Sequence, residues 1–218
     1  MSSDRPSLAR RERTAMVATL RAAGPDAPTL CEGWTTRDLA AHLVVREGRP
    51  DAAIGVFVPA LAPRLEELRL RECEREWDDL LSRIDDGAPW YSPLRYADQV
   101  ANAAEYLVHH EDVLRARQGW SAREFGPEDL ERVWTLATTV AKTFLRKVRA
   151  RVELRPPSEM PASKVAPVST GAAVAPMVSV TAEPVEMLLW AFGRDAVRVD
   201  VSGAQRGIDE VLAVSRGI

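Results

Sequence analysis

The chain has 218 residues, of which 46% are hydrophobic and 28% charged, so it can bury a sizeable core and is too apolar for a disordered protein. Its 29 Lys and Arg residues are outweighed by 32 Asp and Glu residues, which excludes a broadly basic surface for nucleic acid or anionic membranes. Two cysteines, Cys31 and Cys73, are too few for a disulfide framework. The sequence has no apolar leader and no run long enough to span a membrane, so we expect a cytoplasmic protein.

Amphipathic helices are predicted over the first two thirds of the chain. The first is expected at Ser7–Ala23, and the second begins at Thr35, whose hydroxyl can cap the helix while Asp38 completes a capping-box pattern. Three longer helices are expected at Arg64–Ile84, Pro93–Arg117 and Pro127–Arg149. Such helices joined by short loops predict a mainly α fold, an antiparallel helical bundle.

The composition changes near residue 155, where a segment rich in proline, alanine and valine begins. We therefore predict a bundle domain at 1–153 and a small α+β domain at 154–218. Within the second domain, strands are expected at Met177–Thr181 and Val197–Val201, on either side of a helix at Pro184–Phe192.

The fourth predicted helix carries Glu105, His109 and Asp112 on one stripe that contains no Lys or Arg. Such a stripe is either a solvated face with an ordinary ion pair or a polar site inside a bundle. His42 lies between Leu39 and Val45 on the core-facing side of the second helix, where it is either a ligand or a satisfied core histidine.

Taken together, His42, Glu105 and His109 form a three-ligand set for a divalent ion that leaves coordination positions for water or substrate. His110 is turned about 100° away on the helix and is expected to be structural. Cys73 falls on an apolar stripe and Cys31 in a loop, so neither is expected to act as a nucleophile.

Three segments resemble the DinB-like superfamily and, within it, the N-terminal domain of mycothiol-dependent maleylpyruvate isomerases, closest to an uncharacterised metal-binding branch. They are Gly33-Trp34-Thr35-Thr36-Arg37-Asp38-Leu39-Ala40-Ala41-His42-Leu43, then Glu105-x-x-x-His109-x-x-Asp112, and Val185-Glu186-Met187-Leu188-Leu189-Trp190-Ala191-Phe192-Gly193-Arg194. The resemblance implies that His42, Glu105 and His109 bind the metal. It also implies that Asp112 orients a ligand imidazole. The implied ion is zinc, although two histidines and one carboxylate also suit Fe(II).

Two functions fit this pattern. The first is a metal-dependent thiol S-transferase or isomerase that uses mycothiol, because a metal favours the reactive thiolate form of a thiol. The second is a non-catalytic module that binds metal or responds to metal or thiol status. Expected partners are a small-molecule thiol and an electrophilic substrate, with no nucleic acid and no membrane, in a monomer or homodimer.

Arg194 follows the helix expected at Pro184–Phe192, where Gly193 permits the turn that ends it. It is either a surface arginine near a helix C-terminus or a catalytic-site residue whose fork holds a substrate carboxylate.

Overall fold

The structure is a computed structural model that describes residues 5–49, 62–92, 95, 101–157, 164–168 and 175–214. It is mainly helical with one small sheet, as predicted. The chain divides into two compact units, Met1–Ala122 and Arg123–Ile218. The division falls earlier than the expected boundary at 153/154.

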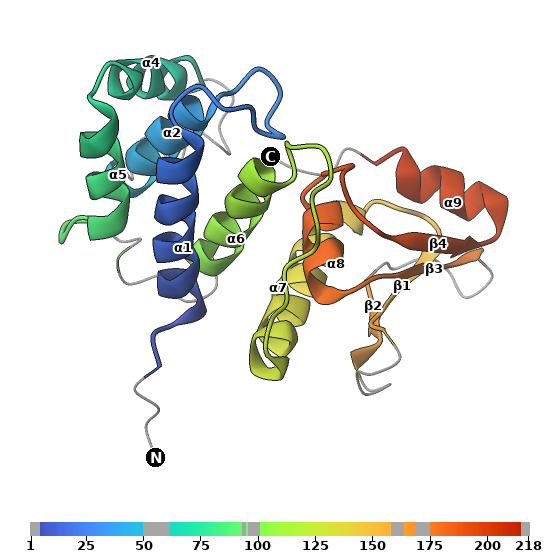
Figure 1. Cartoon of the computed structure of the whole chain (residues 1–218). Coiled ribbons are helices and arrows are strands. Elements are labelled where there is room, and N and C mark those ends of the chain that lie inside the picture. The colour runs from blue at the N-terminus through green and yellow to red at the C-terminus, as the bar shows by residue number, and fades with distance from the viewer. Residues whose placement is uncertain are drawn as a thin grey trace. The chain divides into compact units, whose positions relative to one another are not determined.

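In its described part, the first unit has helices and none of the sheet's strands (Figure 1). They are α1 (Leu8–Ala23), α2 (Thr36–Gly48), α4 (Ala62–Cys73), α5 (Trp77–Asp86) and α6 (Ala101–Leu114). α1 packs along α6, and α2 packs against α4 and α5. The apolar core between them includes fully buried Met16, Leu20, Leu39, Leu80 and Tyr106. Side chains of α2 and α6 contact one another within this unit, and both helices carry predicted site residues.

The beginning of α2 confirms the predicted capping box, and α1 also begins with a side-chain cap. Ser7 caps α1 by accepting a hydrogen bond from the Arg10 amide. Thr35 and Asp38 form a complete capping box at the start of α2. These polar contacts satisfy amides that would otherwise lack a partner at each helix start.

The single helix expected at Arg64–Ile84 is wrong, because the structure has α4 and α5 with a break between them. The guanidinium of Arg37 binds at the break, where Nη1 donates to the carbonyls of Cys73 at 3.0 Å and Arg75 at 2.8 Å. A contact from a distant segment thus takes up carbonyls near the end of α4. The predicted fourth helix is described from Ala101 and ends at Leu114, and its expected first residues lie largely outside the described part.

In its described part, the second unit combines three helices with a four-stranded sheet. Its elements are α7 (Pro127–Leu145), β1 (Arg151–Arg155), β2 (Ala166–Pro167), β3 (Met177–Thr181), α8 (Pro184–Ala191), β4 (Asp200–Gly203) and α9 (Gln205–Leu212). The strand order is β2-β1-β3-β4, with β1 and β3 parallel and the outer pairs antiparallel.

α7 packs with elements of the second unit. α7 packs against α8, all of whose residues are buried. A helix that is buried around its whole circumference needs neighbours on every side, and α7 is one of them. β1 and β2 were not expected, and the strand expected at Val197–Val201 lies at Asp200–Gly203 instead.

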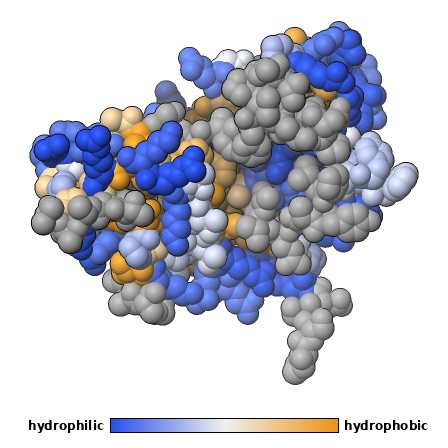
Figure 2. All heavy atoms as spheres, turned by 180° about the vertical axis from the view of Figure 1, so that it is seen from behind, coloured by the Kyte–Doolittle hydropathy of each residue, from blue (hydrophilic) through white to orange (hydrophobic). Residues whose placement is uncertain are grey.

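Most of the coloured surface in Figure 2 is hydrophilic, with smaller hydrophobic areas between. In the described part of the chain, no helix combines the length and the apolar character that crossing a membrane requires.

Candidate metal centre

α2 and α6 bring His42, Glu105 and His109 together. Glu105 Oε1 lies 3.2 Å from His42 Nε2 and 3.3 Å from His109 Nε2. One donor atom from each residue lies within 4.8 Å of the other two. The rings of His42 and His109 meet edge to face, with centroids 5.3 Å apart. The three predicted residues therefore lie close together, although they belong to two different helices.

Asp112 lies one turn beyond His109, beneath its ring. His109 Nδ1 donates to Asp112 Oδ2 at 2.9 Å, and Asp112 is fully buried. A carboxylate only accepts hydrogen bonds, so this contact keeps a proton on Nδ1 and directs Nε2 toward Glu105 and His42. Asp112 thus has the position predicted for a residue that orients a ligand imidazole.

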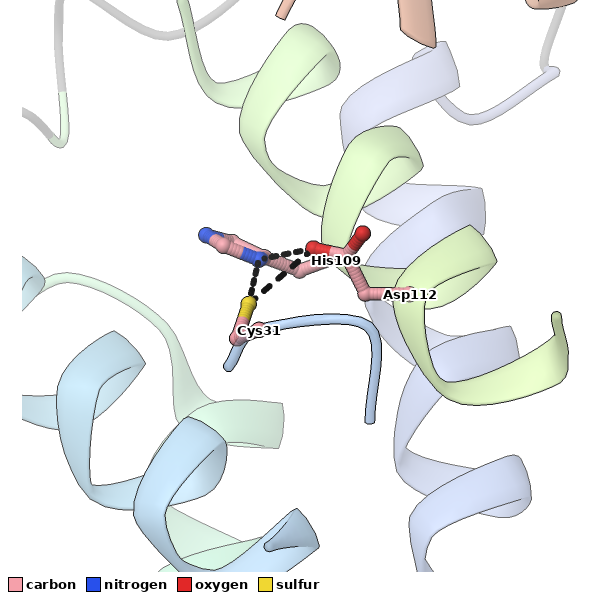
Figure 3. Close-up of side chains that lie close together, drawn as sticks. All are labelled: Cys31, His109 and Asp112. Carbon is pink, nitrogen blue, oxygen red and sulfur yellow. Dashed lines mark hydrogen bonds and ion pairs between the residues drawn. The ribbon is translucent and has the colours of Figure 1, made fainter. Parts of the chain in front are cut away.

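Cys31 forms a second cluster with the same histidine (Figure 3). Its Sγ donates to Asp112 Oδ2 at 3.3 Å and lies 4.0 Å from His109 Nδ1. Cys31, His109 and Asp112 also satisfy the distance requirement of a metal-binding group. The two clusters use opposite nitrogens of one imidazole, so a neutral His109 serves only one of them as a ligand at a time.

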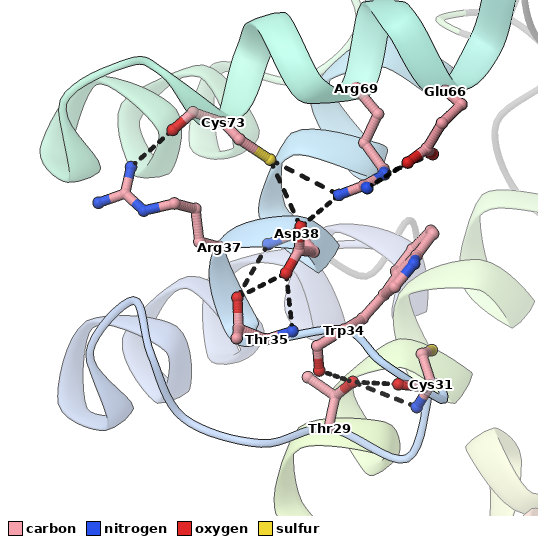
Figure 4. Close-up of polar contacts among 9 residues, drawn as sticks. All are labelled: Thr29, Cys31, Trp34, Thr35, Arg37, Asp38, Glu66, Arg69 and Cys73. Atoms are coloured by element: carbon pink, nitrogen blue, oxygen red, sulfur yellow. Dashed lines mark hydrogen bonds and ion pairs between the residues drawn. The ribbon is translucent and has the colours of Figure 1, made fainter. Parts of the chain in front are cut away.

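The loop before α2 holds Cys31 in this position. Thr29 Oγ1 accepts from the Cys31 amide at 3.1 Å and donates to the Trp34 carbonyl at 2.9 Å (Figure 4). The Leu30 amide donates to the Asp112 carbonyl at 3.0 Å, which ties the loop to α6. Gly33 has φ 75°, a left-handed conformation that favours glycine, and so allows the turn from Cys31 to Trp34.

Trp34 connects this centre to α4. Its ring centroid lies 5.3 Å from that of His42, and the Arg69 guanidinium lies over the indole at 4.9 Å. Arg69 is buried and forms ion pairs with Asp38 of the capping box and with Glu66 (Figure 4). The indole therefore contacts both the Arg69 guanidinium and the His42 imidazole.

His109 lies between two carboxylates, those of Asp112 and Glu105, and these favour its protonated form. Burial acts to lower the pKa of His109, but hydrogen bonds with Asp112, Cys31 and Glu105 outweigh it and hold that pKa well above its usual value. Burial acts to raise the pKa of Glu105, yet hydrogen bonds from His109 and His42 keep it well below. Burial lowers the pKa of His42. The centre therefore provides an ionised carboxylate and a neutral imidazole near neutral pH.

This donor set fits a divalent cation. Two imidazole nitrogens and one carboxylate oxygen suit Zn²⁺ and also Fe²⁺. Both histidines already direct Nε2 at the same carboxylate oxygen, so a cation bound there would replace protons shared between these groups.

His110 and Cys73 have other partners within the first unit, and Arg194 is described within the second unit. Both ring nitrogens of His110 face α1, at 2.8 Å from Thr19 Oγ1 and 3.2 Å from Glu12 Oε2. Cys73 contacts Arg69 and Asp38, so the apolar surroundings expected for it are wrong. Arg194 belongs to the second unit, where its Nη1 donates to the Phe192 carbonyl at 2.9 Å, and Gly193 has the expected positive φ.

Three residues of the centre were not predicted: Cys31, Trp34 and Arg46. Arg46 lies four residues after His42 on α2, a spacing that gives both residues one helix face and would have indicated it. Its Nε lies 3.3 Å from Glu105 Oε1. The loop residues Cys31 and Trp34 carry no periodic signal, and only their contacts identify them.

Comparison with known proteins agrees with this architecture. Residues 7–78 match the family described as "Mycothiol maleylpyruvate isomerase N-terminal domain", a segment that includes His42 and ends before Glu105. No curated protein matches the chain.

Two solved structures are similar, namely the mycothiol-dependent maleylpyruvate isomerase and a histidine-to-alanine mutant of it. The first has a TM-score of 0.55 at 17% identity, and the second a TM-score of 0.55 at 15% identity. Each match covers 89% of this chain and 90% of the other. The N-terminal segment is thus similar to this family, and the chain shares the fold of the isomerase, as the sequence predicted.

Proposed function

We propose that this protein binds one divalent metal ion, Zn²⁺ in our expectation, and acts as a thiol S-transferase or isomerase with mycothiol as co-substrate. The observation that carries the proposal is the convergence of His42 Nε2, Glu105 Oε1 and His109 Nε2 within 4.8 Å. The similarity to a mycothiol-dependent isomerase, in fold and in the N-terminal family, supports the choice of a thiol.

Each residue of the centre has a distinct task in this proposal. His42 and His109 provide neutral nitrogen ligands, and Glu105 provides one negative charge. Asp112 holds the proton at His109 Nδ1, and the Cys31 thiol donates to the same carboxylate. A bound divalent cation supplies the charge that favours the thiolate form of a thiol with an ordinary pKa near 8.5.

Thiol titration tests this function directly. The protein is prepared with Zn²⁺ and, after chelation, without it, and each form is titrated with mycothiol in a calorimeter. We expect saturable binding only to the loaded form. Equal binding to both forms, or binding to neither, would contradict a metal-dependent thiol site.

A non-catalytic role in metal or thiol sensing is the second candidate, because Cys31, His109 and Asp112 form an alternative ligand set. A Cys31→Ser variant separates the two candidates. Loss of bound metal in that variant would favour the sensing role, since the enzyme proposal uses no sulfur ligand from the protein.

The role of Arg194 as a residue that holds a substrate carboxylate remains a prediction. Arg194→Lys keeps the charge and loses the bidentate fork. We expect it to weaken binding of acidic ligands while metal content and melting temperature stay unchanged. Unchanged affinity for every acid and thiol tested would indicate that Arg194 is only a surface arginine near a helix C-terminus.

A further inference from the structure

Arg46 places a guanidinium against the same carboxylate oxygen that both histidines contact. Its Nε lies 3.3 Å from Glu105 Oε1, and its Nη1 donates to Asn102 Oδ1 at 2.9 Å. The Arg46 side chain is only 14% exposed. A cation bound by Glu105 would therefore share that oxygen with a nearby positive charge. For metal binding alone this arrangement is unfavourable, because like charges at short range repel.

The charges around the centre show what the arginine adds. In the described part of the first unit, Arg13 of α1 pairs with Glu47 of α2, and Glu111 of α6 pairs with Arg115 just after that helix. Among the residues that the structure describes, the centre has two carboxylates, Glu105 and Asp112, which together balance one divalent cation when both imidazoles are neutral. With Arg46 included, the loaded centre is left with one positive charge.

We propose that Arg46 turns the metal-loaded centre into a binding site for one monoanion, a thiolate or a carboxylate. This inference rests on the proposed function, because it requires the divalent ion. A monoanion beside both cations restores neutrality and relieves their repulsion. The side chains of His42, Glu105 and His109 are 11–19% exposed, so the centre is not fully closed to solvent.

A bracing role is the alternative for Arg46, in which it only holds Glu105 in place for the metal. The two roles predict opposite effects on metal affinity. If Arg46 braces Glu105, its removal weakens metal binding. If Arg46 provides the charge that attracts an anion, its removal leaves metal binding equal or stronger and weakens anion binding.

The test compares Arg46→Gln and Arg46→Lys with Arg21→Gln, a control that removes one exposed charge from α1. Zn²⁺ affinity is measured by calorimetry. Anion affinity is measured on the Co²⁺-loaded proteins from the visible absorption of the ion, in separate titrations with 2-mercaptoethanol and with acetate. The first probe provides a thiolate without a carboxylate, and the second provides a carboxylate without sulfur. The stronger response therefore identifies which of the two groups the centre binds.

We expect Arg46→Gln to bind Zn²⁺ at least as tightly as the wild type and at least one of the two anions about tenfold more weakly, a change of about 1.4 kcal/mol. Arg46→Lys, which keeps the charge, should retain most of the anion affinity, and Arg21→Gln should match the wild type. Joint loss of metal and anion binding in both Arg46 variants would overturn the proposal in favour of bracing. Unchanged anion affinity in Arg46→Gln would also overturn it. A wild-type protein that binds no metal would instead refute the proposed function, and this inference with it.

Discussion

Asp112→Asn removes one negative charge beneath His109 and changes little else. Asparagine has nearly the shape of aspartate and keeps an oxygen that can accept from Nδ1, now 2.9 Å from the carboxylate. Because Asp112 is fully buried, the lost charge is not replaced by solvent. Loss of a partner that orients a metal ligand typically lowers metal affinity roughly 10–100-fold, or about 1.4–2.7 kcal/mol. We expect Zn²⁺ binding by this variant to fall within that range.

The assay is a calorimetric Zn²⁺ titration of the wild type, Asp112→Asn and Asp85→Asn. Asp85 is exposed on α5, so its variant controls for the change in net charge. Thermal unfolding of each protein checks that the fold is retained. If Asp112→Asn binds Zn²⁺ as tightly as the control, Asp112 does not act on the metal through His109, and the assignment of Nε2 as the ligand atom loses its support.

Three further predictions concern stability. His110→Ala should keep its metal but lose about 1–3 kcal/mol of unfolding free energy, because Glu12 is left without this partner in a buried site; a stability equal to that of the wild type in urea would contradict this. Chelation should lower the melting temperature, since free metal at 100 times its Kd stabilises the native state by about 2.7 kcal/mol; an unchanged melting temperature of demonstrably metal-free protein would argue against ligands from two helices. Asp38→Ala should cost about 1–2 kcal/mol through loss of the capping box. Burial acts to raise the pKa of Asp38, but hydrogen bonds with Thr35 and Arg69 lower it, so its contribution is complete above pH of about 4 and lost on further acidification; equal acid sensitivity of the variant and the wild type would refute it.

Local chemistry made part of the structure predictable from sequence. The starts of α1 and α2 follow from hydroxyl caps, which act within one turn of the chain. The pairing of Glu105 with His109 follows from helical spacing, and the facing of His42 follows from its apolar neighbours. These signals act within about one helical turn, so they predict local structure without knowledge of contacts from distant segments.

The features that the sequence did not predict depend on contacts between distant segments of the chain. The break between α4 and α5 coincides with Arg37, which belongs to α2. α7 packs on α8, and the amphipathic pattern of α7 alone does not identify that partner. Cys31 reaches His109 only because its loop is bonded to α6. Periodicity within one segment carries no information of this kind.

Metal content tests the central claim most directly. Wild-type protein and the variants His42→Ala, Glu105→Ala, His109→Ala and His110→Ala are purified alike, and bound metal is measured by plasma mass spectrometry. The account predicts about one divalent ion per chain in the wild type and in His110→Ala, and almost none in the other three. Full retention of metal in His109→Ala would contradict it.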